Sequence, residues 1–89
     1  MSRHEIIADV MVNDVLLRSA DVSYGFDHVC GYFIQVFSAD NPDVPVFDED
    51  SAFSSLTGSK MLDAFEEMGI YDHVSEEHKT AMALDLPIP

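Results

Sequence analysis

Basic side chains are scarce in this sequence. Its 89 residues contain four Lys and Arg against seventeen Asp and Glu, which gives a formal net charge of −13 at pH 7. The bases are scattered along the chain, at Arg3, Arg18, Lys60 and Lys79. Because a nucleic-acid binder needs clustered bases to displace counterions from phosphates, direct nucleic-acid binding is excluded as the main activity. An anionic membrane surface is disfavoured for the same reason.

Cysteine and long apolar runs are also nearly absent. Cys30 is the single cysteine, so no disulfide can form within the chain, and a reducing compartment is favoured. No apolar run approaches the roughly 20 residues that a membrane-spanning helix needs. Residues 1–9 contain Glu5 and Asp9 and lack the basic start and apolar stretch of a signal peptide. We therefore expect a cytoplasmic protein.

Apolar side chains, in contrast, are plentiful. They make up 47% of the residues, and the mean hydropathy is +0.05. Disordered chains combine high net charge with low hydrophobicity, which this chain does not. The length allows one hydrophobic core. We predict a single folded domain over residues 1–89.

The first half of the chain predicts mainly β-structure. Residues 30–38 are apolar on both faces, which is typical of a central strand, and residues 22–26 can pair with them across a turn at 25–28. Residues 5–12 fit a strand or a helix, and we choose the strand. Asn13 then resembles the N-cap of a short helix over 15–20. Residues 39–45 predict a loop, because they contain two prolines, and 46–47 an edge strand.

The second half predicts helices. Ser51, Thr57 and Ser75 resemble helix N-caps, and Gly69 a helix stop. The main helix is expected over 58–68, and the last helix is expected to bury Ala81, Met82 and Leu84. The order indicates an α+β fold, with a small antiparallel sheet of three to four strands packed by two to three short helices. The sheet face away from the late helices then needs a cover: the N-terminal helix, a second copy of the chain, or a partner.

No residue pattern indicates catalysis or a metal site. His28 and Cys30 would share a strand face, as a nucleophile pair or two zinc ligands would, but further ligands at a recognisable spacing are missing. His73 and His78 are interpreted as solvated helix-end residues. The acidic residues 40–50 lack the central glycine and closing glutamate of a calcium-binding loop. We expect no enzyme activity, no metal and no cofactor.

The acidic residues are unevenly distributed. Residues 1–20 have a net charge of −1 and residues 21–89 a net charge of −12. No basic side chain occurs between Arg18 and Lys60. Asp63 and Glu67 stand four apart on the expected helix, a like-charge pair that costs a few tenths of a kcal/mol, roughly 0.2–0.5. A sequence selected for stability alone would place Lys at one of these positions.

Three explanations for this repulsion stay open. The acids serve solubility or life in high salt; or they present a negative surface to a basic partner, imitating the phosphates that this partner binds; or an apolar sheet face binds a protein, as in an adaptor or a regulatory dimer. We favour the second explanation. The residues expected to contact the partner are Asp40, Asp43, Asp48, Glu49 and Asp50, a second patch of Asp63, Glu66 and Glu67, and the aromatic anchors Phe47 and Tyr71.

In size, acidity and layout the chain resembles the small phage and mobile-element inhibitors that include anti-CRISPR proteins. The features that carry this resemblance are the short chain, the lack of a catalytic motif and the base-free, acid-rich segment from Asp21 to Asp50. The resemblance rests on no specific motif, so no functional residue is carried over from it. It implies a setting, the cytoplasm of a bacterial host, and a mode of action: occupying the nucleic-acid groove of a CRISPR effector, or another basic surface, so that DNA cannot bind.

Overall fold

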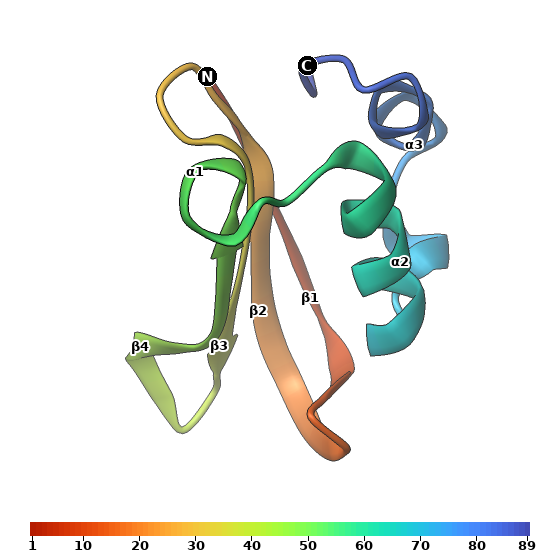
Figure 1. Ribbon diagram of the computed structural model, residues 1–89. Coiled ribbons are helices and arrows are strands. Elements are labelled where there is room, and N and C mark those ends of the chain that lie inside the picture. Colours follow the sequence, from red (N-terminus) through yellow and green to blue (C-terminus); the bar gives the residue numbers. More distant parts are fainter.

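A four-stranded antiparallel sheet forms the frame of the molecule, and the computed structural model describes all residues, 1–89 (Figure 1). The strands are β1 (Ser2–Val12), β2 (Val15–Asp27), β3 (Gly31–Ser38) and β4 (Asn41–Asp50), and they pair in sequence order. They are followed by α1 (Ser51–Ser54), α2 (Gly58–Met68), the 3-10 helix η1 (Tyr71–His73) and α3 (Glu76–Ala83). The predicted α+β fold is confirmed. None of the helices is long and apolar enough to cross a membrane.

The first two strands form a tight hairpin. Asn13 and Asp14 have φ angles of 51° and 66°, which is the geometry of a two-residue type I′ turn. Val12 pairs with Val15 directly across this turn. The helix predicted over 15–20 is therefore wrong, and so is the role of Asn13 as its cap. A short apolar run fits the periodicity of a helix and that of a strand. Here hydrogen bonding with β1 selects the strand.

A bulge bends this hairpin halfway along its length. Arg18 and Ser19 of β2 lie opposite the single residue Asp9, between the pairs Ala8–Ala20 and Val10–Leu17. Ser19 adopts a φ of 51°, and its N–H donates to Asp9 Oδ1 at 2.9 Å. Such a bulge increases the local twist of the sheet.

The turn between β2 and β3 lies later than predicted. β2 continues to Asp27, so the turn covers residues 28–30 instead of 25–28. Asp27 Oδ1 accepts hydrogen bonds from the N–H groups of Val29 (2.7 Å) and Cys30 (3.4 Å), and these bonds lower the pKa of the Asp27 carboxyl. His28 and Cys30 consequently lie in a turn, and the expectation that they share a strand face is wrong.

Strand β4 replaces the loop predicted over 39–45. Only Ala39 and Asp40 form the connection, and β4 extends from Asn41 to Asp50. Its prolines are compatible with a strand because β4 is an edge of the sheet, where one side of the backbone needs no partner. Two register shifts against β3, at Val36/Phe37 and Phe37/Ser38, accommodate them.

The helix boundaries agree largely with the sequence. Thr57 Oγ1 accepts from Lys60 N–H and caps α2, Gly69 ends α2 with a φ of 80°, and Ser75 Oγ caps α3.

The N-cap predicted for α1 is one residue too late. Asp50, and not Ser51, accepts the N–H of Phe53, at 2.6 Å.

The core lies between the sheet and helices α2 and α3, which cover the same face (Figure 1). Met61, Phe65 and Met68 of α2 are buried against strand residues of that face, as the helical spacing predicted. The strand residues that are completely buried are Val10, Ala20, Val22, Ile34 and Val36. Ala81 and Met82 of α3 are buried too, but Leu84 is 63% exposed, which corrects its predicted inward position.

The C-terminal segment folds back onto the sheet, and both chain ends lie at the same end of the molecule (Figure 1). Ile88 is 3% exposed and belongs to the core. The Tyr32 hydroxyl donates to the Leu86 carbonyl at 2.6 Å, and His4 Nε2 lies 2.8 Å from the Pro89 carbonyl. This segment therefore closes one end of the core.

His78 is part of the same closure. Its Nδ1 lies 2.7 Å from the Tyr24 hydroxyl, and its ring lies 4.1 Å from the ring of His4. Burial, followed by the proximity of His4, lowers the pKa of His78, while Glu77 partly opposes the shift. The interpretation of His78 as a solvated residue is wrong, whereas His73 is exposed as expected.

We predict that Gly58→Ala destabilises the protein. A Cβ at this position would collide with the main-chain carbonyl of Met82, so α2 could not approach α3 as closely. In a helix interior alanine is more stable than glycine by about 1 kcal/mol, and at the first helical position, where Gly58 lies, this gain does not offset the collision. Here we expect the free energy of unfolding to fall by about 1–3 kcal/mol, the usual cost of overpacking. Urea denaturation measures this, with the exposed Ser59→Ala as control; a gain in stability for Gly58→Ala would contradict the close approach.

We also predict that stability falls as the pH is lowered from about 7.5 to 5.5. The pKa of His78 is lower in the folded chain than its ordinary value of 6.5, so the unfolded chain takes up more protons in this range. The urea midpoint should drop, and His78→Gln should flatten this pH dependence while His73→Gln keeps it. Equal slopes in both variants would rule out His78 as the cause.

Candidate acidic interface

One face of the sheet is covered by no helix. Strand register places alternate residues of all four strands there, in three rows that we name the open face. These rows are Arg3, Gly25, Phe33 and Asp50; Glu5, Ser23, Gln35 and Asp48; and Ile7, Asp21, Phe37 and Pro45. The N-terminal helix that could have covered this face does not exist. The central strand β3 is therefore covered by helices on one side only.

The open face is negatively charged. It carries four acids, Glu5, Asp21, Asp48 and Asp50, and one base. That base, Arg3, donates to Ser23 Oγ at 2.7 Å, and its guanidinium lies 4.8 Å from the centre of the Phe33 ring. The protein has two ion pairs, Arg18–Asp9 and Lys79–Glu76, and Arg3 takes part in neither. The four carboxylates are thus left without a paired cation.

Asp21 lacks a partner even for hydrogen bonding. It lies between Ile7 and Phe37 in its row, and its Oδ1 is buried without any hydrogen bond. A buried carboxylate oxygen normally has a donor, and leaving it unpaired costs free energy. The open face therefore has an unused acceptor on the interior strand β2.

A shallow pocket of about 150 Å³ lies at one end of the open face. The carboxylates of Asp27, Asp48 and Asp50 line it together with Arg3 and Cys30. Nowhere in the chain do three or more His, Cys, Asp or Glu side chains come together in a way that could hold a metal ion. The pocket is therefore a local concentration of negative charge next to the Phe33 ring.

Strand alternation divides the first acidic patch predicted from the sequence. Asp48 and Asp50 point to the open face, about 6–7 Å apart along β4 by strand geometry. Glu49 pairs with Ile34 and points to the helix side. Asp40 lies in the β3–β4 turn, and Asp43 is exposed near the start of β4. The five acids do not form one continuous face.

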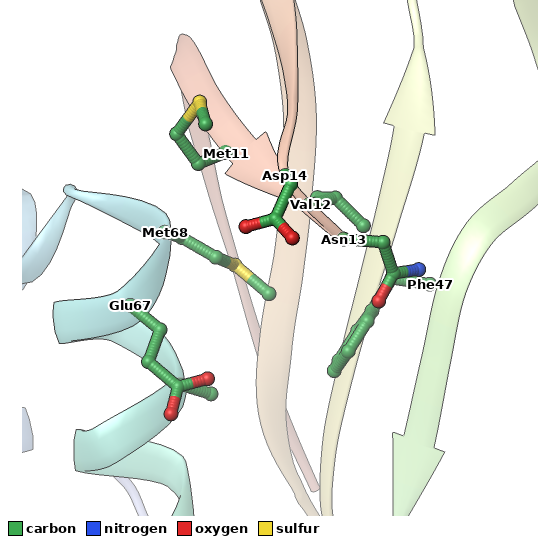
Figure 2. A pocket seen from close by; sticks show the side chains of 8 residues that line it. Met11, Val12, Asn13, Asp14, Phe47, Glu67 and Met68 are labelled. Carbon is green, nitrogen blue, oxygen red and sulfur yellow. The ribbon is translucent and has the colours of Figure 1, made fainter.

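A second depression, which we name the groove, lies on the helix side of β4 (Figure 2). It has a volume of about 390 Å³ and lies between α2, β4 and the β1–β2 turn. Met68 reaches from α2, and Phe47 from β4, towards the space between these elements (Figure 2). Asp14 and Glu67 contribute carboxylates to its lining. Phe47, predicted as an aromatic anchor, is half-buried here.

The second predicted patch is split along α2. Glu67 lies on the side of Ala64 and lines the groove, whereas Glu66 lies one turn after Leu62 on the opposite flank. Asp63 is exposed on the outer surface of the helix.

The second predicted aromatic anchor, Tyr71, lies in η1 on another part of the surface. Tyr71 packs against the core, and Lys79 Nζ lies 4.2 Å from the centre of its ring. Its ring already has a cation within its own chain.

The sequence analysis did not identify Glu5, Asp14 and Asp21 as members of these surfaces. The alternation Arg3–Glu5–Ile7 along β1 was a usable signal for the open face. Asp21 and Asp14 could be placed only once the register and the turn were known, because the predicted helix over 15–20 separated them from the sheet.

Comparison with known proteins gives no match. Neither a protein-family model nor a curated protein nor a solved structure is similar to this chain. What the open face and the groove can bind is therefore inferred from their own charges and contacts.

Proposed function

We propose that this protein is a non-enzymatic acidic inhibitor that binds a basic, nucleic-acid-binding surface of another protein and thereby blocks DNA or RNA. The observation that carries the proposal is the open face, where four carboxylates lie among polar and apolar side chains and no cation is paired with them. In the form implied by the resemblance stated above, the partner is the nucleic-acid groove of a CRISPR effector.

The arrangement of the carboxylates supports a phosphate-like surface. Asp48 and Asp50 are separated by two strand positions, or about 6–7 Å, which is comparable with the spacing of successive phosphates. Glu5 lies in the same row as Asp48 on the other edge of the sheet, so negative charge flanks the central strands on both sides. A surface that binds phosphates by Lys and Arg is attracted by the same pattern.

Charge also favours a basic partner over a second copy of the chain. Two open faces brought together would place their carboxylates, which have no paired cation, against each other, and like charges at an interface cost several kcal/mol. A basic surface gains from the same carboxylates, and the attraction is long-ranged and weakened by salt.

The alternative is an adaptor that binds through apolar contacts, and two exposed side chains favour it. Ile7 of the open face is 63% exposed, and Leu16 of β2 is 50% exposed. In that case acidity would serve solubility, and binding would depend on these residues and little on salt.

We expect Asp48→Lys combined with Asp50→Lys to abolish binding to the basic partner. Asp48 is exposed, whereas Asp50 is half-buried and caps α1, so the double variant should lose about 1 kcal/mol of stability with the cap while the sheet is retained. Circular dichroism and urea denaturation verify this. The partner is captured at low salt, eluted at high salt and identified. Its complex with duplex DNA or RNA is then titrated with the wild-type protein and with the variant. Displacement of the nucleic acid by the wild type alone, with affinity falling steeply as salt rises, is the expected result.

The matched control is Asp63→Lys combined with Glu66→Lys, which changes the net charge equally but lies on α2. We expect this control to lose less affinity than the open-face variant. Equal losses would show that net charge, rather than the open face, governs binding. Undiminished binding by the open-face variant, together with loss on Ile7→Ser, would favour the adaptor.

A further inference from the structure

We infer that the groove is a receptor for an arginine side chain of the basic partner. This inference rests on the proposed function, since it names one anchor within that interaction. The groove has an apolar floor, an aromatic ring and two carboxylates, and it is accessible from outside (Figure 2). Its volume of about 390 Å³ is within the range of small-ligand sites, roughly 300–1,000 Å³.

The floor suits the aliphatic stem of such a side chain. Val12 and Met68 are buried, at 7% and 4% exposure, and they meet Ala64 and Phe47 in the groove. Arginine places its methylene groups on apolar surface while its charged head stays near polar groups. The Phe47 ring adds a face on which a guanidinium can stack.

The polar lining suits a cation. Neither Asp14 nor Glu67 takes part in an ion pair, and neither carboxylate accepts a hydrogen bond within the chain. Glu67 also lies in the last turn of α2, which contains no basic residue and where the helix dipole is negative. Three sources of negative potential therefore converge on one apolar depression.

The geometry favours arginine over lysine. The two carboxylates come from different elements, the β1–β2 turn and α2, and lie at different parts of the groove lining (Figure 2). A planar guanidinium has five N–H donors in a fixed fork and stacks on aromatic rings, so its donors and its face suit a lining that combines carboxylates with an aromatic ring. A lysine ammonium is a compact, strongly hydrated charge that cannot stack in this way.

The groove and the open face can serve one partner because β4 lies between them. Phe47 points to the groove, and its chain neighbour Asp48 points to the open face. A basic surface that reaches around the β4 edge would contact both. The open face then provides attraction over distance, and the groove fixes the position of one side chain.

The test is an NMR titration of the protein with N-acetyl-arginine methylamide. We expect shifts of the Phe47 ring, Ala64 methyl and Met68 methyl signals, and weaker shifts with the lysine analogue. The citrulline analogue, which has the shape of arginine without its charge, should bind poorly. Equal binding of the citrulline or the lysine analogue would overturn the assignment, as would the absence of shifts at these three residues.

Substitutions locate the charge requirement. Glu67→Gln should weaken binding of the arginine probe roughly three- to fivefold, the effect of one solvent-accessible ion pair. Asp14→Asn should weaken it similarly, and asparagine tolerates the positive φ of this turn position. Glu66→Gln, the same change on the opposite flank of α2, should leave binding unchanged. Equal effects of Glu66→Gln and Glu67→Gln would contradict a site in the groove.

The result of the titration with the arginine probe is independent of the test of the open face. The titration needs only the isolated protein and a small probe, so it can fail while salt-dependent competition with nucleic acid persists. Conversely, the Asp48→Lys and Asp50→Lys variant should still bind the arginine probe, because neither residue lines the groove.

Discussion

The packing of α2 against one face of the sheet is the interaction on which the rest of the molecule depends. Phe65 and Met61 are completely buried there against Val22, Ile34 and Val36. Since side chains alternate along a strand, committing one set of residues to this contact sends the other set to the opposite face. The position of every carboxylate on the open face follows from it, although no carboxylate takes part.

The acidic surface is carried at a cost to stability that the apolar core must offset. Asp63 and Glu67 repel each other along α2, Glu66 and Glu67 lie at the unfavourable end of the helix dipole, and Asp21 keeps an oxygen unpaired. A domain of this size has a small free energy of unfolding, so such repulsion removes a substantial part of it. Binding of cations to these sites would relieve repulsion and stabilise the folded state at the same time.

The sequence was sufficient for features decided by neighbouring residues and insufficient for those decided by pairing. The caps Thr57 and Ser75 and the stop at Gly69 act within one helical turn, and they were predicted correctly. Residues 15–20 and 39–45 became strands because β1 and β3 offered partners, which local propensity does not report. The same limit applied to the candidate interface. Asp48 and Asp50 were selected correctly as residues of one side, but the separation of Glu49 and the contribution of Asp14 needed the register.

The order of the strands has a consequence for how the chain folds. Each strand pairs with its neighbour in sequence, so the sheet can assemble as three successive hairpins with short loops and without the long-range strand pairing that slows folding. The contact between His4 and Pro89 joins residues 85 positions apart and requires the closure of almost the whole chain. We therefore expect the C-terminal segment to pack against the sheet last in folding, after the sheet and its acidic face have formed.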